Sequence, residues 1–209
     1  MKKYVETFLL AAGAGIAIAI GGTVYLSMEN RILGAFLFTV GLYLIVTSGL
    51  NLYTGKIGYL PEQGRGYLSF LLVVWLGNLA GTFLGAQALL HTRIGKIAED
   101  AAGICQGKLS DSPGSMFLLG IFCGILMYGA VDGYKKTKNS LILFLCVGVF
   151  ILSGFEHCVA NMFYFSLANA WSPKAFLYLV IVTLGNSAGG MLFPLLHIGG
   201  FEKKGENEK

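Results

Sequence analysis

The adjacent pair Glu156-His157 is the part of the sequence best suited to chemistry. Both side chains can ionise. They lie in a stretch of 35 residues, 139–173, in which Glu156 is the only Asp, Glu, Lys or Arg. A cationic histidine attracts an anion, whereas a neutral one can donate a hydrogen bond or pass a proton. Asn161 follows four residues after His157, so it lies on the same face if a helix resumes there. These three side chains predict a polar site in an apolar setting.

The composition places that site inside a membrane. The chain has 209 residues, of which 55% are hydrophobic and 12% charged, and its mean hydropathy is +0.69. Soluble domains carry about 25% charged residues, and disordered chains have low hydrophobicity. An integral membrane protein remains. The basic residues cluster in loops, as membrane topology requires, so we expect the lipid bilayer and no nucleic acid as a partner. An ionisable residue at mid-membrane costs at least about 2.5 kcal/mol, which makes Glu156 and His157 functional candidates.

Six apolar windows are each long enough to cross a bilayer. They cover residues 7–28, 32–55, 66–92, 112–131, 139–173 and 175–201. As one straight helix the fifth window would be about 52 Å long, against a hydrocarbon core of about 30 Å. We therefore expect this span to have an irregular centre and to end in a semi-apolar loop. The prediction is an all-α membrane protein with six transmembrane helices, forming a single domain over residues 1–209.

The basic residues predict the orientation. With six spans both termini lie on one side, and that side collects ten of the 15 Lys and Arg residues. The excess places both termini in the cytoplasm of a multi-pass protein of the plasma (inner) membrane. Residues 202–209 then form a short charged cytoplasmic tail.

A short motif occurs once in each half of the chain. Residues 76–81 read LGNLAG and residues 184–189 read LGNSAG, 108 positions apart. Three spans per half make the second half enter the membrane from the opposite side, which is typical of an inverted-topology repeat. We place repeat one at about 1–95 and repeat two at about 110–200. Asn78 and Asn186 are expected to make interhelical hydrogen bonds rather than to line a pore.

The repeat also predicts paired interruptions in the second and fifth spans. Segments 48–55 and 153–161 both contain Ser-Gly followed by polar groups at membrane depth. Non-helical backbone survives there only where it lines a cavity or is buried in protein. We expect the two breaks to face each other across a pathway, with Thr54 close to His157.

Other kinds of site lack support in the sequence. There is no metal-ligand spacing, phosphate-binding loop or nucleophile–base pairing, and three of the four cysteines sit in apolar runs without a CxxC pattern. Such cysteines usually act as small buried hydrophobes. We therefore predict no catalytic residue, no metal and no cofactor, and a protein that is not an enzyme.

The two broken segments resemble a known family. Residues 153–162 are similar to the fifth-helix signature of the formate/nitrite transporter family, and Leu52-Tyr53-Thr54 is similar to the loop that interrupts its second helix. The paired Gly-Asn motifs, the six spans and the cytoplasmic termini also resemble this family. The resemblance implies an aquaporin-like six-helix protomer with helices 2 and 5 interrupted, assembled as a homopentamer with one pore in each protomer.

The resemblance also implies roles for single residues. His157 matches the central pore histidine and Thr54 its hydrogen-bonding partner, and with Asn161 they make up the expected anion-binding centre. The supporting residues are Glu156, Lys108, Asn78 and Asn186. The positions that match the pore constriction are Phe38, Leu42, Leu52, Tyr53 and Phe150. Two positions depart from the formate channels of the family. Tyr128 stands where they carry an Asn in the fourth helix, and Lys108 is the nearest counterpart of the Lys that precedes that helix.

These residues predict a passive channel for a small monovalent anion. The short loops and the two departures resemble the hydrosulfide-channel branch, so hydrosulfide is the first expectation, with formate or nitrite as other substrates. Apolar constrictions would exclude hydrated cations. We expect His157 to titrate between about pH 5 and 8, which would make the anion flux depend on pH.

Two alternatives stay open. One is formate or nitrite transport coupled to a proton through His157. The other is a neutral-solute pore resembling aquaporins, although the Asn-Pro-Ala box of that family is absent, since Met162 follows Asn161 and Ser187 follows Asn186.

Overall fold

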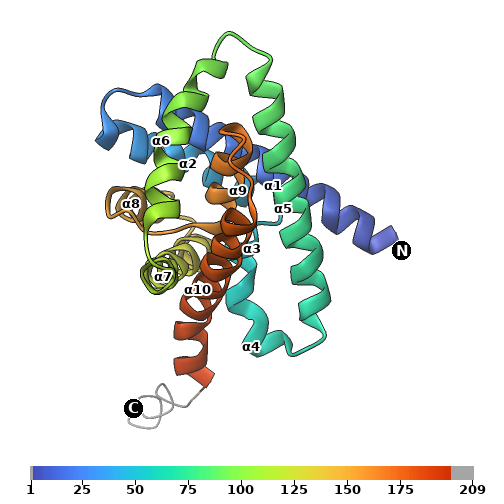
Figure 1. The fold of residues 1–209 in the computed structure, drawn as a ribbon. Helices are drawn as coiled ribbons and strands as arrows, with labels where there is room; N and C mark the ends of the chain where they lie inside the picture. The colour runs from blue at the N-terminus through green and yellow to red at the C-terminus, as the bar shows by residue number, and fades with distance from the viewer. Residues whose placement is uncertain (1, 199–209) are drawn as a thin grey trace.

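The structure is a computed structural model that describes residues 2–198, and this part of the chain is entirely helical (Figure 1). Four of its helices are long and apolar enough to cross a membrane: α1 (Lys2–Ser27), α5 (Tyr67–Leu90), α7 (Pro113–Thr137) and α10 (Pro173–Ile198). The shorter elements are α2 (Arg31–Thr47), α3 (Tyr53–Lys56), η1 (Ile57–Tyr59), α4 (Leu60–Gln63), η2 (Gly95–Ile97), α6 (Ala98–Ser110), α8 (Leu141–Leu152) and α9 (Cys158–Leu167). The predicted all-α membrane fold is confirmed.

Two spans are built from pieces, as the sequence predicted. The second consists of α2 followed by α3, η1 and α4, and the fifth consists of α8 followed by α9. Both breaks begin in the same way. Gly49 and Gly154 adopt left-handed backbone with φ of 67° and 69°. The next residue, Leu50 or Phe155, then donates its backbone N–H to a carbonyl five residues back, at 2.9 Å in each case. This is the glycine-dependent ending of an α-helix, which stops the helix inside the membrane and gives partners to some of its last carbonyls.

Asn78 of α5 holds the first break. Its Oδ1 accepts a hydrogen bond from the backbone N–H of Tyr53 at 2.8 Å. Its Nδ2 donates to the backbone carbonyls of Ala11 at 2.8 Å and Asn51 at 2.9 Å. The first N–H groups of a helix have no partner within the helix, so the start of α3 requires such an acceptor. One carboxamide thus joins α1, α5 and the start of α3.

Asn186 of α10 makes the same three kinds of contact at the second break. Its Oδ1 accepts from the backbone N–H of Cys158 at 2.9 Å. Its Nδ2 donates to the backbone carbonyls of Gly120 at 2.8 Å and Glu156 at 2.7 Å. Both asparagines are fully buried. They act as the interhelical hydrogen bonds that the sequence predicted.

Small residues let the clamping helices approach. A Cβ on Gly81 would meet the backbone carbonyl of Ala12, and a Cβ on Gly189 would meet that of Ile121, both too close for any side chain. The pairs α1–α5 and α7–α10 are therefore in backbone contact, and Figure 1 shows α7 and α10 side by side. Such contact between small residues is the usual way in which membrane helices pack.

The α6 helix was not expected from the sequence, in which the residues between the two repeats were taken as a connection. It is shorter and more polar than the spanning helices, with Glu99 and Asp100 in its first turn and Lys108 in its last. It packs against α9. Ser112 then caps α7 by accepting a hydrogen bond from the Ser115 N–H, and Pro113 occupies the first helical position, where its missing N–H costs nothing. The helix brings Lys108 to the second break.

The predicted tail 202–209 and the last three residues of the sixth window lie outside the described residues.

We predict that Asn78→Leu and Asn186→Leu each destabilise the protein by at least about 2 kcal/mol, because each removes the partners of two buried backbone groups at a break, one N–H and one carbonyl. The measurement is the thermal midpoint in detergent, followed by size-exclusion chromatography. Thr82→Val is the matched control, since Thr82 is buried on α5 but bonds only to carbonyls of its own helix. Equal midpoints for Asn78→Leu and Thr82→Val would contradict the clamping role.

Candidate functional site

His157 stands at the start of α9, in the second break. Its backbone is extended, with φ of −108° and ψ of 116°, and its Nδ1 accepts a hydrogen bond from the Ala160 N–H at 3.0 Å. Its Nε2 lies 2.8 Å from Oγ1 of Thr54, which comes from the first break. A ring nitrogen that accepts carries no hydrogen, so the neutral ring holds its proton on Nε2 and donates it to Thr54. The hydroxyl hydrogen of Thr54 is then available for another acceptor.

Apolar side chains surround this pair. The ring of Phe150 stacks on that of His157, with 5.6 Å between centroids. Phe38 meets Phe150 edge-on, with centroids 6.2 Å apart and planes at 85°. Leu42 and Leu52 are both about 99% buried. Of the residues expected at a constriction, Phe38 and Phe150 are thus in direct contact beside the polar pair.

Two cavities flank the apolar cluster. The α6 cavity, of about 330 Å³, is lined by residues from α1, α2 and α6–α9, including Phe38, Phe150 and His157. The lysine cavity, of about 110 Å³, is lined by Leu52 together with Lys56, Lys135 and Lys138, among others. His157 lines the α6 cavity, and its partner Thr54 lies in the chain between Leu52 and Gly55, which both line the lysine cavity. The Thr54–His157 pair therefore lies between the two cavities.

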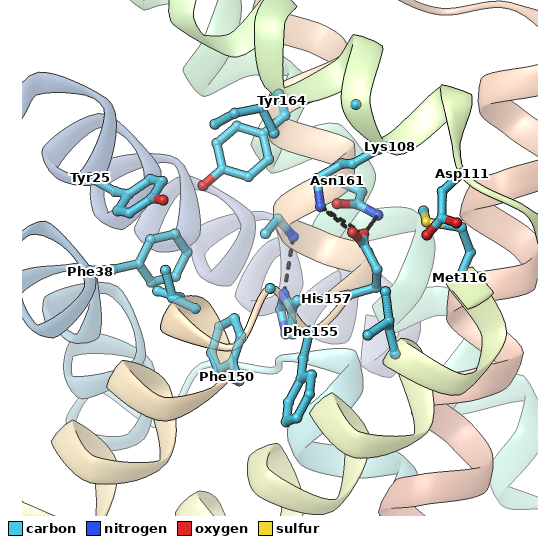
Figure 2. A pocket seen from close by; sticks show the side chains of 17 residues that line it. Tyr25, Phe38, Lys108, Asp111, Met116, Phe150, Phe155, His157, Asn161 and Tyr164 are labelled. Carbon is cyan, nitrogen blue, oxygen red and sulfur yellow. Dashed lines mark hydrogen bonds and ion pairs between the residues drawn. The ribbon is translucent and has the colours of Figure 1, made fainter. Parts of the chain in front are cut away.

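The negative charge of Glu156, next to His157, is balanced by a neighbouring cation and a hydrogen-bond donor. Its carboxylate accepts hydrogen bonds from Lys108 Nζ at 2.6 and 2.7 Å and from Asn161 Nδ2 at 2.8 Å (Figure 2). Removing one partner of such a buried pair leaves an uncompensated charge, which costs far more than the pair contributes. The pairing means that the α6 cavity does not present a bare negative charge, and the Lys108 ammonium lines it.

Two of the expected residues point elsewhere. The ring of Tyr53 lines a groove between α5 and α10, and its hydroxyl lies 2.9 Å from Oγ of Ser187. Neighbouring residues of a helix point about 100° apart, so with Thr54 facing His157 its neighbour faces α10. Tyr128 packs against Tyr59 with 6.0 Å between ring centroids and lines neither cavity.

Sequence reasoning missed Tyr25 and Tyr164, which both line the α6 cavity. A signal for Tyr164 existed, because His157, Asn161 and Tyr164 are spaced i, i+4 and i+7 and so share one face of α9. Tyr25 belongs to α1 and no spacing connects it to the site.

The outer edge of the α6 cavity carries Asp111, between α6 and α7. Its carboxylate accepts hydrogen bonds from the Ser115 hydroxyl at 2.6 Å and the Ser112 N–H at 2.7 Å. These bonds lower the pKa of Asp111 below its ordinary value, so the group is charged at neutral pH.

Comparison with known proteins decides the family. Residues 1–198 match the family model described as "Formate/nitrite transporter". The chain belongs to the formate/nitrite transporter family. It is therefore a multi-pass membrane protein and an anion channel, not an enzyme.

Relatives and solved structures agree with this assignment. The formate channel FocB of Escherichia coli (strain K12) is 28% identical in an alignment that covers 96% of this chain and 78% of FocB. The nitrite transporter NirC of Salmonella typhimurium is 27% identical, over 91% of this chain and 79% of NirC. A solved pentameric formate channel with formate bound is 27% identical and superposes with a TM-score of 0.81, over 95% of this chain and 97% of that one.

We predict that Phe150→Ala lets acetate pass, because the change removes a ring that stands between the two cavities. The measurement is acetate and formate flux into proteoliposomes, expressed as a ratio, and we expect this ratio to rise at least about tenfold. Phe176→Ala is the control, since that ring on α10 is 54% exposed on the outer surface. An unchanged ratio in Phe150→Ala would show that the ring does not limit the size of the solute.

Proposed function

We propose that this chain conducts formate or nitrite passively through a pore in each protomer. The observation that carries the proposal is the hydrogen bond between Thr54 and His157, which joins the two helix breaks inside an apolar cluster between two cavities. The relatives support this substrate class, because they are formate channels and nitrite transporters.

The chemistry follows from what an anion must lose. A monovalent anion that enters the apolar cluster gives up its hydration, at a cost of many kcal/mol. The Thr54 hydroxyl replaces part of that water as a donor, and the His157 N–H that it accepts polarises it further. The apolar rings and leucines offer no negative charge to a cation, so the loss of its hydration is not compensated there and it is excluded.

Hydrosulfide was the first expectation from the sequence, and we no longer rank it first. The departures at Tyr128 and Lys108 motivated it, yet Tyr128 lies away from both cavities. Lys108 in turn lies at the second break, paired with Glu156. Neither departure therefore separates this site from one that handles formate. Hydrosulfide enters the assay below as the competing substrate.

The hydrogen bonds also favour passive conduction over proton coupling. Nδ1 of His157 already accepts the Ala160 N–H. A second proton on the ring would turn Nδ1 into a donor facing another donor, and the cap of α9 would be lost. The neutral ring fits this site as it stands, so the pH-dependent flux through His157 that the sequence suggested is not part of this proposal.

We further propose that both termini are cytoplasmic and that the protein assembles as a homopentamer. The bias of basic residues supports the orientation, and it places the lysine cavity on the cytoplasmic side and the α6 cavity outside. The pentamer is suggested by the solved formate channel, which is pentameric.

The test is flux into proteoliposomes, run in parallel with formate, nitrite, hydrosulfide and chloride. We expect formate and nitrite to pass fastest. We also predict that Thr54→Val lowers formate flux at least about tenfold, because the isosteric side chain has no donor, whereas Thr54→Ser retains most of it. A channel selective for hydrosulfide, or equal formate flux in Thr54→Val and the wild type, would overturn the proposal.

A variant at His157 tests the passive mechanism. We predict that formate flux in the wild type and in His157→Asn has the same dependence on pH between about 5 and 8, although the variant conducts less. The measurement pairs formate flux with a pH-sensitive dye inside the vesicles. If the wild type moved one proton per formate and His157→Asn did not, proton coupling through this residue would replace passive conduction.

A further inference from the structure

Two tyrosines in the α6 cavity have no assigned role. Tyr25 lies near the end of α1 and Tyr164 near the end of α9, and Figure 2 shows their hydroxyl groups pointing toward one another beside Phe38. Tyr164 is only 6% exposed, yet within residues 2–198 neither hydroxyl has a hydrogen-bond partner. Buried phenol groups usually find one. Two converging donors without acceptors are suited to a ligand that brings acceptors.

The charges around the pair also favour an anion. The Arg31 guanidinium lies 5.4 Å from the centre of the Tyr25 ring. Lys108 lines the same cavity, where it neutralises Glu156. The other carboxylate of the lining, Asp111, lies on the far side of the view from Tyr25 and is occupied by two serine donors (Figure 2). Among the described residues of the cavity lining, both carboxylates therefore have donors of their own and do not compete with an anion for the two hydroxyls.

From this arrangement we propose that Tyr25 and Tyr164 form an entry subsite for a small anion with two oxygen acceptors, such as formate or nitrite. Each hydroxyl donates to one oxygen of the anion before it meets Phe38 and Phe150. This inference rests on the proposed function and narrows it, because an anion with two oxygens offers a separate acceptor to each hydroxyl, whereas both donors must share the single atom of chloride.

The position on α9 makes this a binding site separate from the Thr54–His157 pair. Seven residues, about 10.5 Å of helix rise, separate Tyr164 from His157 on the same face. Phe38 and Phe150 stand beside both positions. An anion is thus held by phenols on one side of the rings and by Thr54 on the other.

The test compares Tyr25→Phe, Tyr164→Phe and the double variant with the wild type. These changes remove the hydroxyls and keep the rings. We expect the formate concentration for half-maximal flux to rise at least about fivefold in the double variant, and by less in each single variant. The maximal flux should stay within about twofold, and chloride flux should change less than formate flux. Tyr43→Phe is the matched control, because Tyr43 is 39% exposed on α2 and lies outside the cavity.

A direct binding measurement makes the test independent of conduction. Saturation-transfer NMR with ¹³C-formate on the detergent-solubilised protein should show a dissociation constant at least about fivefold higher in the double variant than in the wild type. Thermal midpoints check the folding of each variant. If Tyr164→Phe does not fold, the half-maximal concentration and the dissociation constant of Tyr25→Phe test the subsite.

The outcomes separate the subsite from the proposed function. If the double variant has the half-maximal formate concentration and the formate dissociation constant of the wild type, the subsite is overturned and the proposed conduction stands. An equal effect on chloride overturns the two-oxygen selectivity. A wild-type protein that binds formate through these hydroxyls but does not conduct it overturns the proposed function and supports the subsite.

Discussion

A helix that stops in the middle of a membrane exposes backbone donors and acceptors where no water can reach them. Each unpaired group costs several kcal/mol in hydrocarbon, so the two breaks of this fold exist only because their backbone is satisfied from within. Asn78 and Asn186 do this with the same three contacts each, two to carbonyls and one from the first N–H of the following short helix. The Thr54–His157 pair depends on these two carboxamides, because they hold the helix starts that carry it.

The two helix breaks have matching backbone contacts, but the side chains at equivalent positions differ. Tyr53 and Cys158 are equivalent, since each donates its N–H to one of the clamping asparagines. The residues before them, Leu52 and His157, are therefore equivalent as well. One is an apolar wall of the lysine cavity, and the other is the imidazole that reaches Thr54. The inverted repeat supplies two matched helix starts, and different side chains at one position separate the roles of the two halves.

Local patterns in the sequence were enough for the framework. Apolar windows predicted the spans, the recurring Gly-Asn motif predicted the clamps, and the two Ser-Gly segments predicted the breaks and the meeting of Thr54 with His157. All of these depend on periodicity and repetition. The resemblance of the fifth-helix motif predicted the family, but the finer inference of hydrosulfide rested on single positions.

The rest depended on tertiary placement. Lys108 and Glu156 are 48 residues apart and meet only because α6 forms and packs on α9. Nothing in a short polar helix of low periodicity indicates where it will dock. Tyr53 was expected at the constriction with Thr54, but the turn of α3 directs it toward Ser187 instead. Tyr25 reaches the cavity from a helix that carries no other sign of the site.

The clamping asparagines contact only backbone atoms around the breaks, and this separates architecture from selectivity. The side chains of Leu52 and Thr54 take no part in the clamps, so these two positions can change while the hydrogen bonds that hold the breaks persist. One backbone frame can therefore hold pores with different solute preferences, because the groups that fix the helix breaks are not the groups that meet the solute.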